Sequence, residues 1–393
     1  MNLSVAPPDA TLSARAARVA LVAARHADDV DAAARFPREA IDALRAERLL
    51  AIQIPVHLGG EGAGLAQIAN ICCILGQSCS ATAMIFAMHQ IKASSLVEHG
   101  EESVWHTDFM RRMASEQLLL ASATTEGGIG GNLRNSICAI RVEGDSCTLE
   151  KDATVISYGS EADAILITSR AHADAAPADQ VMTVFLKNQY SLEKTHVWNT
   201  LGMRGTCSDG FLFKGQAPAQ QIFPKPFAEI AAQSMLATSH LLWSGVWYGI
   251  AADAVLRAQA FVRAAARKSP GVVPPGAIRL AEVSSKLQIV KSNVIAGLKA
   301  YDDTRSDPDK LMSMAFAIAM NNVKICSSET ILEIINHAML ICGIMGYKNG
   351  TPFSLGRHLR DAHSAQLMIS NDRILSNSAN LLLVQKQDTS LSG

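Results

Sequence analysis

The sequence predicts a mostly helical α+β protein in which a small β-sheet region separates two helical regions. Two changes of pattern along the 393 residues carry this prediction. Near residue 116, the helical spacing of apolar residues gives way to short β-rich runs divided by turn residues. Near residue 226 the helical spacing returns. We therefore expect an N-terminal helical domain at residues 1–115, a middle β domain at 116–225 and a C-terminal helical domain at 226–393.

Composition narrows the class of partner. The 35 basic side chains nearly cancel the 36 acidic ones, so the net charge of the chain is too small to attract nucleic acid or an anionic membrane. We therefore expect a small-molecule partner. The eight cysteines are scattered without a CxxC pair, which predicts free thiols in a reducing compartment, with neither a metal site nor a disulfide framework. The N-terminal stretch lacks the unbroken apolar core of a targeting peptide, and we expect a cytoplasmic protein.

The helices, strands and loops are expected in the following order along the chain. Ala-rich helical runs begin near residue 12, and the turn "IPVHLGGEGAG" at 54–64 precedes a long apolar helical stretch. The run "CAIRVEGDSCTLEKDATVISYGSEADAILITSRA" at 138–171 predicts strands joined by turns. Beyond residue 226, an apolar stripe at three- and four-residue steps suits either a helical bundle or a subunit interface. The stripe consists of Leu280, Val283, Leu287, Val290 and Val294. Loops are expected at 268–276 and 302–309.

The segment 230–252 is long enough to cross a membrane and has no formal charge apart from a possible one on His240. Polar residues interrupt it every few positions, and no basic flank marks an orientation. These features favour a buried core helix over a membrane span.

The stretch "ASATTEGGIGGN" at 121–132 packs four glycines into five positions. Glycine permits positive φ and close approach of the backbone to a ligand, so the stretch is either a plain turn or a cofactor cradle. The dinucleotide spacing G-x-G-x-x-G fails because Leu133 stands at the third glycine, and no Gly-Lys-Ser/Thr follows for a P-loop.

Four motifs, in the same order along nearly the whole chain, resemble those of the acyl-CoA dehydrogenase family. They are "IPVHLGGEGAG", "LLLASATTEGGIGGN", "VWNTLGMRGTCSDGFLF" and "CGIMGYKNGTPFSLGRHLRDA", and a fifth, "ATVISYGSEADAILITSRA", resembles the strand pair of the family that follows the Gly-rich stretch. The resemblance implies a middle β-barrel or sheet domain, a C-terminal four-helix bundle and a homotetramer. It also implies FAD, bound with its flavin ring against the Gly-rich stretch and with its adenine end held by the neighbouring subunit.

The resemblance assigns candidate residues by position. Those expected along the flavin are Ser122, Thr124, Thr125, Ile156, Ser157 and Asn371, with Arg267 and Gly343 toward the adenine end. Thr125 and Ser157 keep hydroxyls that can bond to flavin nitrogen or oxygen atoms. On the substrate side, Gly131 replaces the usual serine and Ile369 replaces the usual glutamate.

That glutamate is the base of the family reaction, because removing the α-proton of an acyl thioester needs a carboxylate. Some relatives place the base instead on the first long helix of the C-terminal domain, where this chain has Ser239 and His240. The nearest carboxylate is Asp372, three residues beyond Ile369, and we expect it to act as a displaced base.

Three readings of the function remain open. The first is an FAD-dependent dehydrogenase of acyl-CoA or carrier-bound acyl thioesters that passes electrons to a separate acceptor. The second is a monooxygenase of the same fold, supplied with reduced flavin by a separate reductase, in which His89 protonates the peroxide. The third is a non-catalytic homologue. The retained Thr125 and Ser157 favour the first.

Overall fold

The computed structural model describes residues 11–128, 132–387 and 389–390. Its N-terminal part is helical, and the helices begin at recognisable caps. The Thr11 hydroxyl accepts a hydrogen bond from the backbone N–H of Ala14, and Ser103 caps α5 in the same way. The helices are α1 (Leu12–Ala32), α2 (Arg38–Ala46), α3 (Leu65–Gly76), α4 (Ser80–His99) and α5 (Val104–Glu116).

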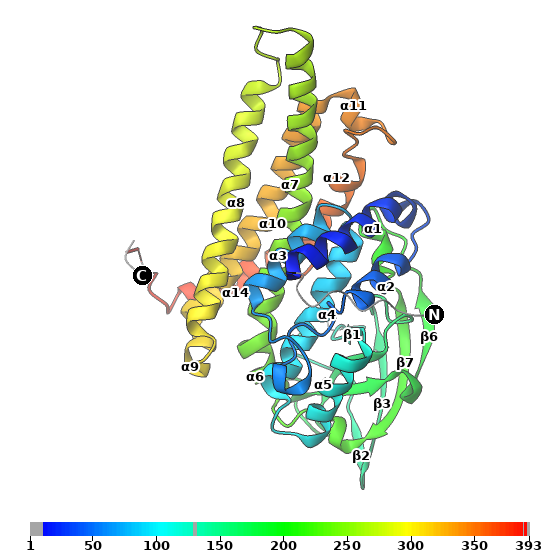
Figure 1. Cartoon of the computed structure of the whole chain (residues 1–393). Coiled ribbons are helices and arrows are strands. Elements are labelled where there is room, and N and C mark those ends of the chain that lie inside the picture. The colour runs from blue at the N-terminus through cyan, green and yellow to red at the C-terminus, as the bar shows by residue number, and fades with distance from the viewer. Residues whose placement is uncertain (1–10, 129–131, 388, 391–393) are drawn as a thin grey trace.

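The middle part consists of two small sheets, one three-stranded with the order β1-β4-β5 and one four-stranded with the order β2-β3-β7-β6 (Figure 1). β1 pairs with β4 in parallel, and the other pairs are antiparallel. Side chains of β3 alternate between buried and exposed, the period-two pattern of a half-buried strand. The strands are β1 (Leu120–Ala123), β2 (Arg141–Glu143), β3 (Ser146–Ala153), β4 (Ala164–Arg170), β5 (Gln180–Leu186), β6 (Tyr190–His196) and β7 (Gly210–Pro218).

Helices return after residue 226. Three long ones, α7, α8 and α10, pack side by side with the shorter α14 and extend beyond the rest of the molecule (Figure 1). The helices are α6 (Phe227–Ile230), α7 (Leu236–Lys268), α8 (Ala277–Thr304), α9 (Pro308–Leu311), α10 (Met314–Cys342), α11 (Ile344–Tyr347), α12 (Gly356–Ala362), α13 (Ser364–Leu367) and α14 (Asn371–Leu382). The mostly helical fold with a central sheet region is therefore confirmed.

The apolar stripe of α8 is used inside the chain. Val283, Val290 and Val294 are buried, and Gly297 approaches Leu241 and Val323 so closely that a Cβ there would lie 2.8 and 2.9 Å from their side chains. The bundle alternative therefore accounts for the stripe. Subunits would therefore associate through other faces of these helices.

Close backbone contact joins the two helical parts. A Cβ added at Gly249 of α7 would lie 2.4 Å from the carbonyl oxygen of Cys73 in α3, and one at Gly76 would lie 2.7 Å from that of Val246. Only glycine allows this spacing. The pair α3 and α7 therefore fixes the C-terminal helices against the N-terminal ones.

The segment 230–252 lies in α6, a π-helical turn at Ala231–Met235 and the first half of α7, and most of its side chains are buried. Among the described residues, one helix, α10, is long and apolar enough to span a membrane by length and composition. α10 packs against α7, α8 and α14, and the core helix of a bundle meets the same test of length and composition.

Candidate flavin site

Four hydroxyl side chains gather along β1 and the turn after β3. Ser122, Thr124, Thr125 and Ser157 are all partly exposed, whereas the flanking Ala121, Ala123, Ile156 and Tyr158 are buried. The Thr125 hydroxyl donates to the carbonyl oxygen of Val155 at 3.1 Å, which joins the start of the Gly-rich stretch to this turn. The Ser157 hydroxyl shares a 2.8 Å hydrogen bond with that of Ser208. We call these four side chains the hydroxyl rim, and the Thr125 hydrogen bond joins its two segments.

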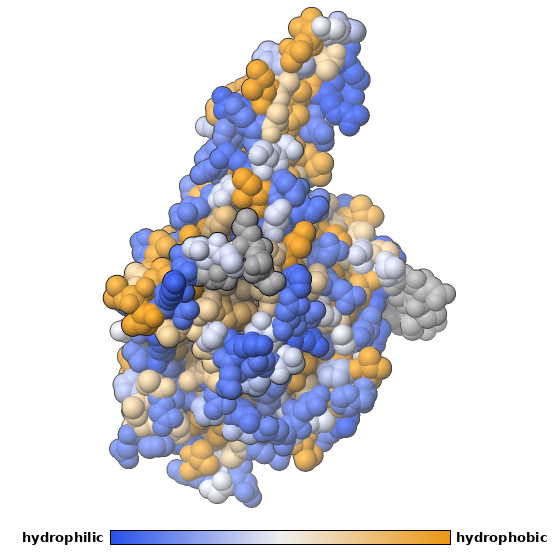
Figure 2. Space-filling view, turned by 90° about the vertical axis from the view of Figure 1, so that its left-hand side faces the viewer, coloured by the Kyte–Doolittle hydropathy of each residue, from blue (hydrophilic) through white to orange (hydrophobic). Residues whose placement is uncertain are grey.

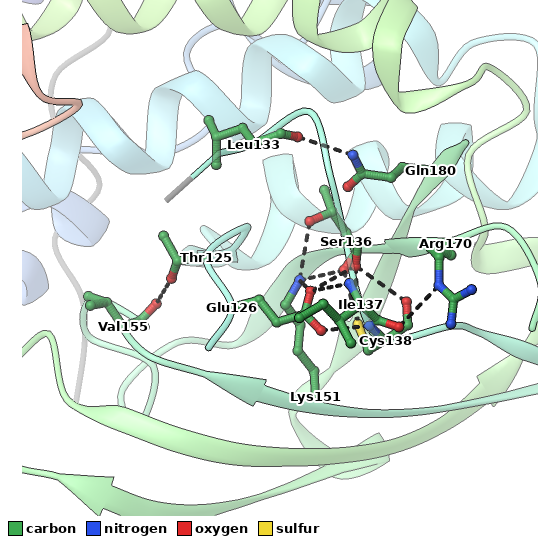
Figure 3. A network of polar contacts seen from close by, with 11 residues as sticks. Thr125, Glu126, Leu133, Ser136, Ile137, Cys138, Lys151, Val155, Arg170 and Gln180 are labelled. Carbon is green, nitrogen blue, oxygen red and sulfur yellow. Dashed lines mark hydrogen bonds and ion pairs between the residues drawn. The ribbon is translucent and has the colours of Figure 1, made fainter. Parts of the chain in front are cut away.

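A buried carboxylate closes the loop that follows this rim (Figure 3). Glu126 accepts hydrogen bonds from the Ser136 hydroxyl at 2.9 Å, from the backbone N–H of Ile137 at 3.0 Å and from that of Cys138 at 2.6 Å. The ammonium of Lys151 lies 3.9 Å from the same carboxylate. Burial alone would raise the pKa of Glu126, but these partners hold it below its ordinary value. The clasp ties Glu126, just after β1, to residues 136–138 and to Lys151 of β3.

The loop also reaches the C-terminal helices. Gln180 of β5 donates to the carbonyl oxygen of Leu133 at 3.1 Å, and the Arg134 guanidinium donates to the side-chain oxygen of Asn377 in α14 at 3.1 Å. This hydrogen bond places Arg134 against α14, although 243 residues separate Arg134 from Asn377. Gly131, predicted on the substrate side, lies outside the described residues.

The segment that leads into α14 is held by a buried lysine. Lys324 of α10 donates to the carbonyl oxygen of Ile369 at 2.8 Å and to the side-chain oxygen of Asn371 at 2.5 Å. Ile369 has a φ of 51°, a left-handed conformation that is rare for a β-branched residue. Such outliers persist where surrounding contacts impose them, and they cluster at functional sites. Asp372, the next residue after Asn371, is exposed on the first turn of α14.

Two domain models match the chain, the acyl-CoA dehydrogenase N-terminal domain over residues 12–117 and the acyl-CoA dehydrogenase C-terminal domain over residues 230–373. Together they cover well over half of the sequence. The chain belongs to the acyl-CoA dehydrogenase family.

Relatives within and around this family differ in chemistry. The chain is 23% identical to cyclohex-1-ene-1-carbonyl-CoA dehydrogenase of Syntrophus aciditrophicus, over 89% of this chain and 83% of the relative. It is 22% identical to the amino sugar nitrososynthase DnmZ of Streptomyces peucetius, over 86% of this chain and 84% of that one. The FMN-bound structure of TdsC from Paenibacillus sp. A11-2 superposes with a TM-score of 0.82 at 17% identity, over 96% of this chain and 98% of TdsC, which shows a shared fold.

Two of the family motifs in this chain meet in space. Asp361 of the "GRHLRDA" stretch accepts a 2.6 Å hydrogen bond from the backbone N–H of Met203 in "LGMRG". Arg360 forms an ion pair with Asp31 of α1. Gly202 packs so tightly here that a Cβ would lie 2.2 Å from the carbonyl oxygen of Arg360. These family motifs therefore pin α12 against the middle sheets.

His89 corrects one sequence expectation. Its Nε2 lies 2.6 Å from the carbonyl oxygen of Leu50, and its Nδ1 accepts the backbone N–H of Leu120 at 3.0 Å. Burial lowers the pKa of His89 to about 4, so the ring is neutral and both nitrogens are engaged. The role of proton donor to a peroxide is wrong for this histidine, because its contacts make it a tie between α4 and β1.

The predicted adenine contacts lie elsewhere on the chain. Arg267 is exposed at the end of α7, and Gly343, with a φ of 55°, is exposed at the end of α10. Both ends lie on the protruding part of the bundle, away from β1 (Figure 1). The single chain does not bring them to the rim. Ile156 is fully buried, its backbone N–H donates to the carbonyl oxygen of Asp209 at 2.9 Å, and its own carbonyl oxygen accepts from the N–H of Gly159 at 3.2 Å.

Sequence reasoning missed the residues that hold the site together. Glu126 stands inside the Gly-rich stretch, yet its clasp depends on Lys151 and on the 136–138 backbone, which no local pattern connects to it. Lys324 lies in a helix that also carries Glu329, Glu333 and several other polar residues, so no local pattern marked it.

Proposed function

We propose that the protein is a flavin-dependent oxidoreductase that holds FAD between the hydroxyl rim and the start of α14 and desaturates an acyl thioester. The observation that carries this proposal is the rim itself, four partly exposed hydroxyls beside a loop clasped at both ends and tied to α14. Membership of the acyl-CoA dehydrogenase family and relatives named as CoA-thioester dehydrogenases support it.

The rim suits the polar edge of a flavin. A hydroxyl has one donor and two acceptor positions, so Thr125, which donates to Val155, keeps lone pairs for an incoming N–H group. The Thr206 hydroxyl donates to the carbonyl oxygen of Met203, so Ser208 donates to Thr206 and Ser157 donates to Ser208, which leaves lone pairs on Ser157 for an incoming N–H group. Bound flavin would supply the acceptor for the substrate hydride.

The chain's own residues would hold the thioester and move the proton. Asp372 is the carboxylate closest in sequence to the family position, and exposure on the first turn of α14 leaves it accessible to a substrate α-proton. The backbone N–H of Ile369, whose turn Lys324 fixes, would donate to the thioester oxygen. In the apo protein such contacts are expected to be loose and to tighten on binding.

One observation favours a monooxygenase as the second candidate. Neither expected position for the base carries a carboxylate, since one is Ile369 and the other falls on Ser239 and His240, both of which are buried, with His240 bonded to Asn321 at 3.2 Å. A monooxygenase needs no α-proton base. TdsC, which shares the fold, is named as a dibenzothiophene monooxygenase.

The two candidates differ in when flavin binds and what reduces it. The dehydrogenase predicts yellow purified protein whose tightly bound FAD is bleached by an acyl thioester without oxygen. The monooxygenase predicts nearly colourless protein that consumes oxygen when given reduced flavin. A protein that binds neither oxidised nor reduced flavin in equilibrium dialysis would exclude both candidates and leave a non-catalytic homologue.

A further inference from the structure

Three lysines are almost completely buried, and they differ in what their ammonium groups meet. Lys151 donates to the carbonyl oxygen of Thr168 at 2.7 Å and lies near the Glu126 carboxylate. Lys324 donates to two oxygens, as described above. Lys92 of α4 is 4% exposed, and its Nζ contacts the thioether sulfur of Met235 at 3.0 Å. Among the described residues it has no oxygen acceptor and no carboxylate partner.

Burying the Lys92 ammonium without an oxygen acceptor is energetically unfavourable. A thioether sulfur is a weak acceptor, and an ammonium in an apolar interior loses its hydration without compensation. Burial lowers the pKa of Lys92 to about 7, and no neighbouring charge offsets the shift. Buried polar groups that lack partners in a folded protein call for an explanation, and an absent ligand is one.

The position of Lys92 links it to the candidate flavin site. His89, three residues earlier on α4, is bonded to the backbone of Leu120 at the start of β1, and the same strand carries Ser122. Met235, whose sulfur contacts Lys92, is the last residue of the π-helical turn that leads into α7. Such turns are frequent at functional sites. Lys92 thus lies between α4 and the start of α7, close to the strand of the hydroxyl rim.

Solvent reaches this part of α4 at one point. Residues 80–87 and 89–96 are all buried, and Met88 between them is partly exposed. Met88 and Lys92 are four residues apart, so they lie one above the other on the same helix face. Leu236, next to Met235, is also partly exposed. Met88 is long and flexible, so its side chain can move aside for a ligand.

From these contacts we infer that Lys92 is a specificity-determining residue that pairs with a carboxylate at the far end of the substrate's acyl group. The inference rests on the proposed function, since it takes the substrate to be an acyl thioester whose reacting end lies at the flavin. A carboxylate would give the ammonium the charged oxygen partner that Met235 does not provide. A neutral alkyl chain of the same length would leave the ammonium uncompensated.

The test compares thioesters matched in carbon number. FAD-loaded protein is titrated with butyryl-, pentanoyl- and hexanoyl-CoA and with succinyl-, glutaryl- and adipoyl-CoA, and the shift of the flavin absorption band gives each Kd. We expect at least one acidic thioester to bind roughly 10-fold or more tightly than its neutral counterpart, as a charge-assisted contact provides. Lys92→Met should reduce this ratio to about one, whereas Lys92→Arg should keep most of it.

Two controls separate the possible outcomes. FAD content of each variant reports whether the fold and the cofactor site survive, and Lys299→Met, which removes a lysine with 74% side-chain exposure on α8, should leave the ratio unchanged. Equal binding of acidic and neutral thioesters, a preference that persists in Lys92→Met, or FAD-loaded protein that responds to neither series would each overturn the inference. Wild-type protein that takes up no FAD would instead overturn the proposed function.

Discussion

The ammonium of Lys324 lies 2.8 Å from the carbonyl oxygen of Ile369, the residue expected at the position of the catalytic glutamate of acyl-CoA dehydrogenases. The contact joins the middle of α10 to the turn before α14 and holds that turn in a left-handed conformation. Under the proposed function, an apolar side chain stands at the expected position of the base, on a turn that Lys324 holds. The site retains the means to position a backbone N–H even though the side chain beside it has changed.

Removing this contact should destabilise the turn. Lys324→Met leaves the carbonyl of Ile369 without its donor and removes the shortest hydrogen bond of the Asn371 side chain, and a buried unpaired acceptor costs about 1–3 kcal/mol. Urea unfolding should show the loss as a lower midpoint. Lys310→Met, on a side chain with 71% exposure, should stay within about 0.5 kcal/mol of wild type. Equal midpoints for both variants would mean that Lys324 contributes nothing to the turn.

Bulk in the Gly-rich loop should impair flavin binding more than the loss of one hydroxyl. Gly128 has a φ of 84°, and an added Cβ would lie 3.2 Å from the Cδ1 of Ile137. Gly128→Val should therefore distort the loop beside the rim. Thr125→Val removes one hydrogen bond, worth about 1 kcal/mol, and should lower flavin affinity only several-fold.

A second glycine provides the matched control for that prediction. Gly144 also has a positive φ, 57°, but it lies in the turn between β2 and β3 with open space around its Cα. Gly144→Val should cost comparable strain, about 1–3 kcal/mol, without changing the absorbance ratio of bound flavin to protein. If Gly128→Val kept a normal ratio as well, the loop would be a plain turn.

Association should depend on the outer face of the bundle. Ile289 and Ile295 of α8 are each 55% exposed, and apolar side chains also crowd the protruding end of the helices (Figure 2). Exposed apolar surface of this kind marks interaction sites, and we predict a homotetramer, or at least a dimer. Ile289→Asp should shift the mass measured by light scattering toward the monomer. Val142→Asp, at a 51% exposed position in the middle sheets, should not. A wild-type monomer at micromolar concentration would refute the prediction.

Stability should fall in mild acid. Burial lowers the pKa values of His89, His99, His106 and His240 to about 4. The same side chains titrate near 6.5 in an unfolded chain, so between these values the unfolded state binds more protons. The Tm should therefore decrease as the pH is lowered through this window. His240→Gln should reduce the slope, and the exposed His57→Gln should leave it unchanged.

The order of helices, sheets and helices was predictable because each part has its own spacing of apolar residues. The use of the α8 stripe was not, because an apolar face fits a neighbouring helix of the same chain as well as another subunit. The hydroxyls at Ser122, Thr125 and Ser157 were found through family motifs, which are local. The Glu126 clasp and the Lys324 contact join residues far apart in sequence, and only the tertiary structure brings them together.

The identity of the base is the prediction that most directly separates the candidate reactions. Asp372→Asn preserves the shape of the side chain but removes its basicity, and loss of a general base typically costs about 10²- to 10⁴-fold in rate. Anaerobic mixing with acyl thioesters should show this loss as slower flavin bleaching with unchanged flavin content.

Ile369→Glu places a carboxylate at the usual family position and should create or raise activity on simple acyl-CoA substrates. Asp303→Asn, an exposed aspartate on α8, should have no effect. Undiminished bleaching in Asp372→Asn would exclude this residue as the base, and no bleaching by any thioester in wild type or Ile369→Glu would favour the monooxygenase.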